Sequence, residues 1–377
     1  MTKHFTEVET TREYNGHLYS VAEALTIVTL GSLCGLRNVN QIHQWAVSER
    51  AREFLCRQYG IARIPSYYWL LCLLKQVEPK SFNRCFIGWV ESLLPAGKGE
   101  LTLAMDGKAI RSTGRMGGQE HPLQILSAHI AELGMTLAQQ AVEEKSNEIP
   151  ALRELLGMLE VEGCLVVADA LHCQKETAQA IVAKKADYLL CAKENQPTLK
   201  EEIADYVRDE ALRAAMESHE THEKNSGRIE HRRAYATHDV AWLSDLKSWA
   251  GLACIGAIRS RITTKKGTRE EWRYYLSSRK LSAKDLLHHA RSQWSLESLH
   301  WLLDVHFGED FCRVEDRNVQ QNLNIIRKTA LNCLRRHKEK TGSKRPLSKI
   351  MFDCLLDPHY ILEILSNTEP VTTKNES

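Results

Sequence analysis

The chain has 377 residues and a formal net charge of +2, and 43% of its residues are hydrophobic while 26% are charged. Because this length exceeds one ordinary domain core, the composition predicts a folded protein of two or three units. The net charge is too small to imply polyanion binding, because affinity for a phosphate backbone depends on local basic clusters. The 11 cysteines form no Cys-x-x-Cys pair, which excludes a zinc ribbon or a dithiol redox motif and indicates reduced thiols.

The N-terminal part of the chain predicts a flexible start followed by a helical domain. Segment 1–17 is polar and lacks the apolar stretch of a signal peptide, and no later segment reaches the roughly 18 apolar residues that span a bilayer. We therefore expect a cytoplasmic protein with no membrane partner. Residues 18–98 show helical apolar spacing and predict a small helical domain, with a linker at 95–99.

From Leu101 onward the pattern becomes that of an α/β domain, which we expect to span 100–365 before a loose tail at 366–377. Three strands are followed by alternating helices and strands. The predicted strands are 101–106, 123–130, 135–142, 164–168 and 188–192, and the predicted helices are 150–159, 174–185 and 198–215. The order βββαβαβα predicts a ribonuclease-H-like mixed sheet flanked by helices, in which the first and fourth strands are neighbours.

Two of these strands are predicted to end in an aspartate, Asp106 and Asp169. Strand ends converge at one edge of such a sheet, so we expect the two carboxylates to lie close together. Either aspartate alone could equally be a turn residue or a helix N-cap. Together they would repel each other unless a divalent cation lies between them.

A third carboxylate is expected downstream, on a helix predicted at 284–308 that precedes another at 317–336. We favour Glu297, which lies between Leu296 and Leu299, although an exposed helical glutamate would look the same. Its rivals in the same segment are Asp304, Glu309 and Asp310. Three such carboxylates can hold two Mg²⁺ or Mn²⁺ ions about 3.5–4 Å apart, which clamp both oxygens of a phosphodiester displacement.

An insertion at about 220–285 is predicted between the sheet and this helix. Its strand-like pieces are 232–237, 252–259 and 272–277, so we expect it to be mostly β. It contains eight basic residues against two acidic ones between Arg259 and Lys280, and a second run from Arg335 to Lys349 has seven against one. One basic run is usually a solvated face, but two runs on either side of Glu297 favour a track for DNA.

Several polar residues follow the predicted strand ends and could meet phosphates or bases, although surface cations would look the same. Trp294 and Trp301 could stack on a base, but aromatic residues at helical spacing more often belong to a core. The histidines His288, His289, His300 and His306 lack a zinc-ligand pattern and are expected to be structural. The predicted DNA-binding residues are Lys108, Arg111, Lys193, Asn195, Arg259, Arg261 and Arg313.

Six segments of the chain together resemble one family. They are LAMDGKAIRST, EEKSNEIPAL, VVADALHCQKETAQAI, DYLLCAKENQPTL, WSLESLHWLLDVHFGEDFCRVEDRN and NLNIIRKTALNCL. In this order they are similar to transposases of bacterial insertion sequences of the H-repeat-associated type, a group of the DDE transposases. The resemblance covers about residues 20–360.

The resemblance implies a ribonuclease-H-like core that uses two Mg²⁺ or Mn²⁺ ions to hydrolyse DNA at the element ends and to transfer the freed 3′-hydroxyls into target DNA. It places the catalytic and metal-binding triad at Asp106, Asp169 and Glu297. Double-stranded DNA, as terminal inverted repeats and target, is the implied partner. We expect a homodimer because two ends must be paired.

The chain departs from the family at three positions near Glu297. Gln293 stands where members have histidine, and Ala290 and Asp304 stand where the wider group has tyrosine and lysine. A DNA-binding derivative that no longer cuts therefore stays open, as does a structure-selective nuclease of the same fold. A haloacid-dehalogenase-like phosphatase is weaker, because its motif needs an aspartate where Lys108 stands.

Overall fold

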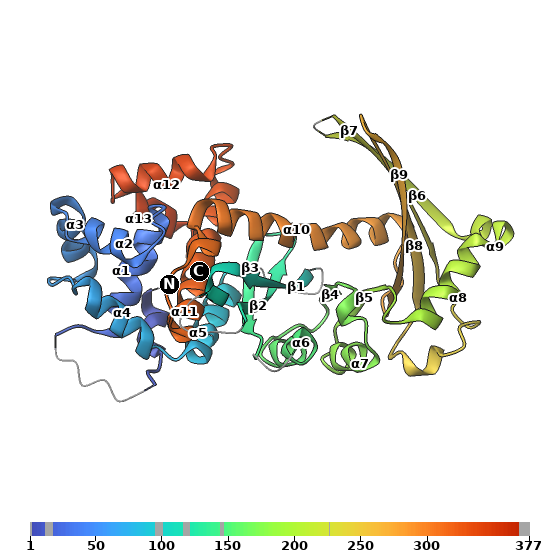
Figure 1. Cartoon of the computed structure of the whole chain (residues 1–377), viewed down its shortest axis with the longest axis horizontal. Coiled ribbons are helices and arrows are strands. Elements are labelled where there is room, and N and C mark those ends of the chain that lie inside the picture. Colours follow the sequence, from blue (N-terminus) through green and yellow to red (C-terminus); the bar gives the residue numbers. More distant parts are fainter. Residues whose placement is uncertain are drawn as a thin grey trace, which may run out of the picture.

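The computed structural model describes residues 2–11, 18–94, 101–115, 121–143, 147–225 and 227–368. The molecule is elongated, with a helical end, a central α/β part and a curved sheet at the other end (Figure 1). The long helix α10 (Ala283–Phe307) runs between the two ends. The predicted linker at 95–99 and most of the predicted tail lie outside the described residues.

The N-terminal region is helical, as predicted. Its elements are η1 (Thr2–Glu7), α1 (Val21–Leu33), α2 (Val39–Ala46), α3 (Glu49–Tyr59), α4 (Tyr67–Gln76) and α5 (Pro79–Ser92). The expected flexible start does not hold for residues 2–11, because Phe5 is buried and its ring lies 5.8 Å from that of Phe82. A large aromatic side chain in the core fixes this short segment.

The C-terminal helices pack against the N-terminal ones. They are α11 (Arg317–Thr341), α12 (Leu347–Leu356) and α13 (Tyr360–Ser366). The buried Asn322 of α11 donates to the carbonyl oxygens of Leu74 and Val77 at 2.9 and 3.0 Å. Arg335 and Arg336 are largely buried in this packing. The second basic run therefore begins inside the fold, and that part of it does not form the solvent-facing DNA track that we expected.

One mixed sheet of nine strands forms the centre of the molecule, in the order β3-β2-β1-β4-β5-β9-β8-β7-β6. Its first five strands are β1 (Thr102–Ile110), β2 (Leu123–Ile130), β3 (Met135–Ala141), β4 (Leu165–Ala168) and β5 (Asp187–Ala192). β1 is antiparallel to β2 and parallel to β4, and β4 is parallel to β5. This is the predicted ribonuclease-H-like topology, with the first and fourth strands adjacent.

The insertion is a direct continuation of this sheet. It contains β6 (Glu217–Asn225), β7 (Arg228–Thr237), β8 (Cys254–Thr264) and β9 (Gly267–Ser277), and β9 pairs antiparallel with β5. We expected three short strands here. β6 was missed because its sequence, ESHETHEKN, has no apolar alternation. The helix predicted at 198–215 is broken into α8 (Pro197–Arg208) and α9 (Glu210–Ala215), because Asp209 caps the second one.

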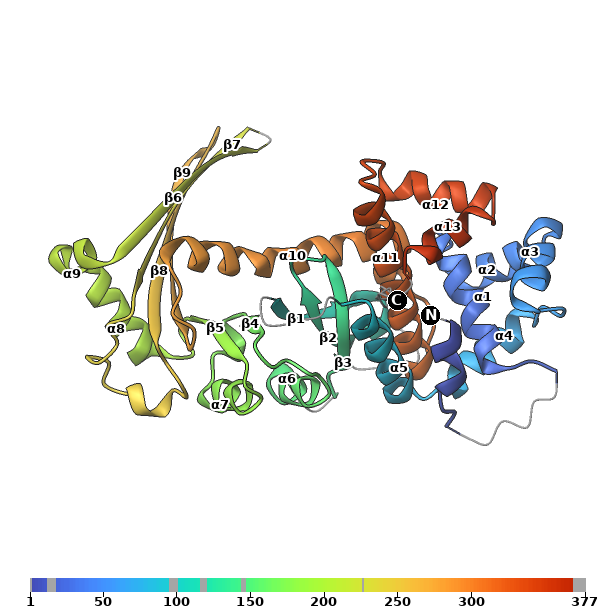
Figure 2. The same cartoon turned by 180° about the vertical axis from the view of Figure 1, so that it is seen from behind.

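Helices cover both faces of the central strands (Figure 2). The helices α6 (Glu148–Gly157), α7 (Lys175–Ala183) and α8 lie on one face, where Val166 and Leu190 join the main core. On the other face, Val167 and Leu189 pack with Leu286 of α10. Consecutive residues of these strands point to opposite faces, and both are apolar because both faces are covered by helices. Among the described helices, none is both long and apolar enough to cross a membrane.

Candidate active site

Asp106 lies in the middle of β1, at the point where the pairing with β4 has ended and the pairing with β2 continues. The parallel pairing with β4 ends at Met105 opposite Ala168, whereas the antiparallel pairing with β2 continues to Ile110. The prediction that the first strand ends at Asp106 is therefore wrong, because β2 still supplies backbone partners beyond it. The loss of β4 as a neighbour leaves room beside Asp106 for other side chains.

Asp169 directly follows β4 and is the N-cap of the short helix η4 (Ala170–His172). Its Oδ1 accepts a hydrogen bond from the Leu171 amide at 3.1 Å, so Asp169 also has the helix-capping role considered from the sequence. Asn195 donates to the Ala170 carbonyl at 2.6 Å and the Cys173 carbonyl at 3.3 Å. These bonds fix the loop that carries Asp169.

Glu148, the first residue of α6, is a third acidic group at this edge. A Cβ atom built at Gly107 would lie only 2.3 Å from a Glu148 carboxylate oxygen, so the carboxylate occupies the space next to the bare backbone of β1. The buried His172 lies between the acids, with its Nε2 3.6 Å from Glu148 Oε2 and 4.0 Å from Asp169 Oδ1. We call Asp106, Glu148, Asp169 and His172 the acidic centre.

The acidic centre holds more negative charge than its surroundings neutralise. Burial, then the charges of Asp169 and Glu148, raise the pKa of Asp106 to about 7. Both ring nitrogens of His172 lack a hydrogen-bond partner among the described residues. Carboxylate oxygens are the ligands that Mg²⁺ and Mn²⁺ prefer, and a dication would remove the repulsion between them. The chemistry of this donor set therefore fits a divalent metal ion.

The sequence reasoning did not identify Glu148 or His172. A signal was present for Glu148, because it follows the N-cap Asn147 at the start of the helix after the third strand. For His172 there was only its position three residues after Asp169, which predicts nothing without the shape of the loop.

Glu297 is on α10, exposed and without a hydrogen bond or ion pair among the described residues. Two contacts fix where α10 crosses β1: Gln293 donates to the Met105 carbonyl at 3.2 Å, and Lys108 bonds to Asp304. Glu297 lies between Gln293 and Asp304 in the helix, which places it level with Asp106. The structure brings Asp106 and Asp169 together. It places Glu297 on the stretch of α10 that crosses β1, with no described contact to either aspartate.

The three rival carboxylates surround Lys108 instead. Lys108 Nζ lies 2.6 Å from Glu309 Oε2 and 4.0 Å from Asp310 Oδ1, and it also bonds to Asp304. Glu309 is buried and accepts a further bond from Asn324 of α11. This Lys108 network ties β1, α10 and α11 together, so Lys108 is engaged by protein carboxylates within the fold.

The other residues near β1 and β5 that we predicted to contact DNA are solvent-facing. The Arg111 side chain is 87% exposed, with its Nε 3.7 Å from Asp310 Oδ2, and Lys193 is exposed. In the insertion, Arg259 pairs with Glu270 at 2.7 Å and lies over the ring of Trp272, while Arg261 is exposed.

Arg313 lines a hollow of about 390 Å³ together with Arg37 and Arg327. No aspartate or glutamate is among the described residues that line it. Arg327 is only 4% exposed, and its Nη1 has no hydrogen-bond partner among the described residues. A buried guanidinium without a carboxylate is energetically costly, so this hollow is suited to an anion.

Some aromatic and histidine side chains of α10 are packed against the protein, and others are exposed to solvent. Trp294 is covered by the guanidinium groups of Arg232 and Arg291, at 4.7 and 5.7 Å from the ring centre, whereas Trp301 is 58% exposed. His289 Nδ1 lies 2.9 Å from Thr102 Oγ1. This contact gives His289 a structural role, as we expected for it.

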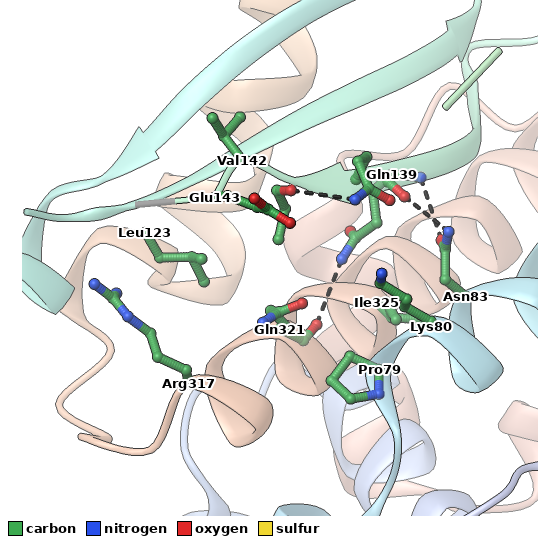
Figure 3. A pocket seen from close by; sticks show the side chains of 12 residues that line it. Pro79, Lys80, Asn83, Leu123, Gln139, Val142, Glu143, Arg317, Gln321 and Ile325 are labelled. Carbon is green, nitrogen blue, oxygen red and sulfur yellow. Dashed lines mark hydrogen bonds between the residues drawn. The ribbon is translucent and has the colours of Figure 1, made fainter. Parts of the chain in front are cut away.

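A different hollow, of about 320 Å³, lies between α5, β3 and α11 (Figure 3). Amide groups dominate its floor: Asn83 donates to the Gln139 carbonyl at 2.7 Å, and Gln139 donates to the Gln321 carbonyl at 3.5 Å. It contains no member of the acidic centre. The acidic centre gathers the carboxylates and raises the pKa of Asp106, so we place the candidate active site there.

Comparisons with known proteins identify the family of the chain. Residues 97–333 match the family described as "Transposase DDE domain", and residues 2–90 match the one described as "DDE_Tnp_1-associated". The chain is 34% identical over 302 residues to YncI of Escherichia coli O157:H7, which is named as a transposase (78% of this chain, 76% of that protein). It is 29% identical over 360 residues to YhhI of Escherichia coli K12, named as an H repeat-associated transposase (93% of each).

A solved structure also has a distant likeness to the chain. It is the cryo-EM structure of the piggyBac transposase synaptic complex with hairpin DNA, with 11% sequence identity and a TM-score of 0.41, covering 96% of this chain and 77% of that one.

Proposed function

Because this chain belongs to the transposase DDE-domain family, we propose that it catalyses DNA transposition: it cuts DNA at the ends of a mobile element and joins the freed 3′-hydroxyls to target DNA. The observation that carries this proposal is the meeting of Asp106 and Asp169 at one edge of a ribonuclease-H-like sheet, where Glu148 adds a third carboxylate.

We propose that Asp106, Asp169 and Glu297 hold two Mg²⁺ or Mn²⁺ ions, and that Glu148 supports the same site. Bound there, the ions would activate the attacking oxygen and stabilise the leaving oxygen of the phosphodiester. Asp106 must lose its proton before it can act as a ligand, because burial and its acidic neighbours favour the protonated form. A small rotation of the His172 ring would let Nε2–H donate to Glu148 or Asp169 and orient that carboxylate, as residues behind metal ligands often do.

The Lys108 network supports the placement of Glu297. Lys108 lies two residues after Asp106 on β1, and its partner Asp304 lies two helical turns after Glu297 on α10. This ion pair therefore fixes the position of the helix that carries Glu297 relative to the strand that carries Asp106.

We propose two DNA-contacting surfaces. The first consists of Arg111 and Lys193 near the acidic centre, together with Arg259 and Arg261 on the insertion. The second is the arginine-lined hollow at Arg313, where a DNA phosphate would supply the anion that Arg327 lacks. Lys108 and Asn195 are less available for DNA, because each is already bonded within the protein. Pairing two element ends would require two active sites, so we also propose a homodimer on DNA.

The test is a cleavage assay on supercoiled plasmid that carries the element ends, with Mg²⁺ or Mn²⁺. We expect nicking and strand-transfer products from the wild-type protein. Asp106→Asn should lower the nicking rate roughly a thousandfold, because a metal ligand contributes several kcal/mol to the transition state. End binding, measured by gel shift, should persist in this variant. Glu297→Gln should also abolish nicking, whereas Glu148→Gln should reduce it by about 10- to 100-fold.

Three other outcomes would contradict parts of the proposal. Undiminished nicking by Asp106→Asn would remove the acidic centre as the active site. Nicking without strand transfer would identify a nuclease of the same fold. End binding without metal-dependent cleavage by the wild-type protein would identify a DNA-binding derivative.

A further inference from the structure

The β6–β7 hairpin carries a cluster of metal-ligand side chains outside the acidic centre. Glu220 and His222 are two residues apart on β6 and so share one face, and His231 of β7 is the cross-strand partner of His222. One ligand atom from each of the three residues lies within 4.8 Å of the other two. We propose that Glu220, His222 and His231 form a second metal site, which binds a divalent transition-metal ion such as Zn²⁺.

The geometry of this cluster is close to that of a bound zinc ion. His231 Nε2 lies 3.2 Å from Glu220 Oε2, and His222 Nε2 lies 3.9 Å from Glu220 Oε1. Zinc bonds of about 2.0–2.1 Å in a tetrahedron place neighbouring ligand atoms about 3.4 Å apart. Small side-chain rotations would therefore bring all three atoms into coordination. The backbone of the hairpin need not move.

The rings of His222 and His231 are stacked face to face. Their centroids are 4.1 Å apart, and their planes differ by 7°. Both present Nε2 toward the same carboxylate. Glu220 and His222 are exposed and His231 is half-buried, so an ion can enter from solvent and keep water in a fourth position.

The donor set distinguishes this hairpin site from the acidic centre. Imidazole nitrogen suits Zn²⁺, Cu²⁺ and Ni²⁺, whereas Mg²⁺ prefers oxygen ligands and keeps its water. Two cations also face the hairpin site: Arg233 is the strand partner of Glu220, and Arg261 is the strand partner of His231. The Glu220 carboxylate supplies the negative charge that the dication needs beside them.

The consequence of binding would be a cross-link between β6 and β7. These strands form the outer edge of the nine-stranded sheet, far from the helical end of the molecule (Figure 1). A metal bridge between side chains would hold the strand register at this edge, as metal sites do elsewhere by coupling binding to folding.

The inference can be tested by zinc titration of the full-length protein against a chromophoric chelator, with Mg²⁺ in excess. The Asp106→Asn background removes one carboxylate of the acidic centre and so weakens zinc binding there, and the comparison of each variant with this parent cancels any binding that remains. We expect His222→Ala and His231→Ala each to weaken zinc binding at one site per chain by at least tenfold. One zinc equivalent is then lost in competition with the chelator. His219→Ala is the matched control, because His219 is on the same strand but on the opposite face. It should keep that equivalent.

Circular dichroism of each variant, compared with the parent, will confirm that the fold is retained. Equal zinc stoichiometry and affinity in the parent, His222→Ala and His231→Ala proteins would overturn the proposal. Loss of the same equivalent in His219→Ala would overturn it too, because binding would not be specific to the cluster. Neither result depends on DNA cleavage, so the proposed transposase function is tested separately.

Discussion

The two halves of the single sheet hold their charged side chains in different ways. In the β1–β5 half, Asp106 and Lys108 are drawn into the protein among other acids, and the pKa of Asp106 is raised to about 7 by burial and by its acidic neighbours. In the β6–β9 half, Arg232 and Glu230 form one buried ion pair on β7, but the pairs on β8 and β9, such as Arg259–Glu270 and Arg273–Glu271, are in contact with solvent.

This difference shows which charged side chains are suited to catalysis and which are suited to binding. A buried charge is stable only with a close partner or a metal ion, so its position is fixed and its proton affinity is shifted. An exposed pair contributes little stability, and its members stay free to exchange one partner for another, such as a DNA phosphate. The core half is therefore suited to catalysis, and the insertion is suited to binding.

The largest expected effect in this comparison comes from removing Lys108. Lys108→Met would leave Asp304 and the buried Glu309 without their cation, so we expect the unfolding free energy to fall by about 3–5 kcal/mol. Urea denaturation at neutral pH measures this loss. Arg111→Met is the control, because its side chain is 87% exposed and should cost less than about 1 kcal/mol. Equal losses in the two variants would contradict a central role for the Lys108 network.

A second prediction uses the raised pKa of Asp106. Because the folded protein holds this proton more tightly than the unfolded chain does, the metal-free protein loses stability as pH rises from about 4 through 7. Asp106→Asn removes that loss. In EDTA at pH 8 we expect the variant to be more stable than the wild type by roughly 2–4 kcal/mol, with the difference vanishing near pH 4.

Thermal unfolding across this pH range, with and without Mg²⁺, checks the second prediction. Adding Mg²⁺ at pH 8 should raise the stability of the wild type and leave Asp106→Asn nearly unchanged. A stability difference that is constant with pH would show that repulsion within the acidic centre is not its cause.

Much of the fold was predictable because its core elements are locally consistent. The apolar runs of β4 and β5, the helical spacing of the N-terminal region and the alternation after Leu101 all identified elements that the structure contains. The adjacency of β1 and β4 followed from the order of the elements. That adjacency was enough to predict that Asp106 and Asp169 lie close together.

What could not be predicted depends on contacts between segments distant in sequence. The strand β6 is polar on both faces, and only its pairing with β7 makes it a strand. Glu148 reaches the acidic centre because Gly107, 41 positions earlier in the chain, leaves space for it. Lys108 looked like a free cation, and its engagement by carboxylates of α10 and of the segment after it became visible only in three dimensions.

The smallest expected effect on stability is also the sharpest test of the insertion as a binding surface. Charge reversal of both Arg259 and Arg261 to Glu should change the unfolding free energy by less than about 1 kcal/mol, because Arg261 is exposed and the Arg259–Glu270 pair is half-exposed to solvent. The same variant should bind DNA more weakly, with a salt dependence that is shallower by about 0.9 for each phosphate that it no longer neutralises. Gel-shift titrations at several salt concentrations measure this slope. An unchanged slope would exclude the two arginines from the DNA surface. A large loss of stability would show that the insertion, like the core half, uses its charges to hold the fold together.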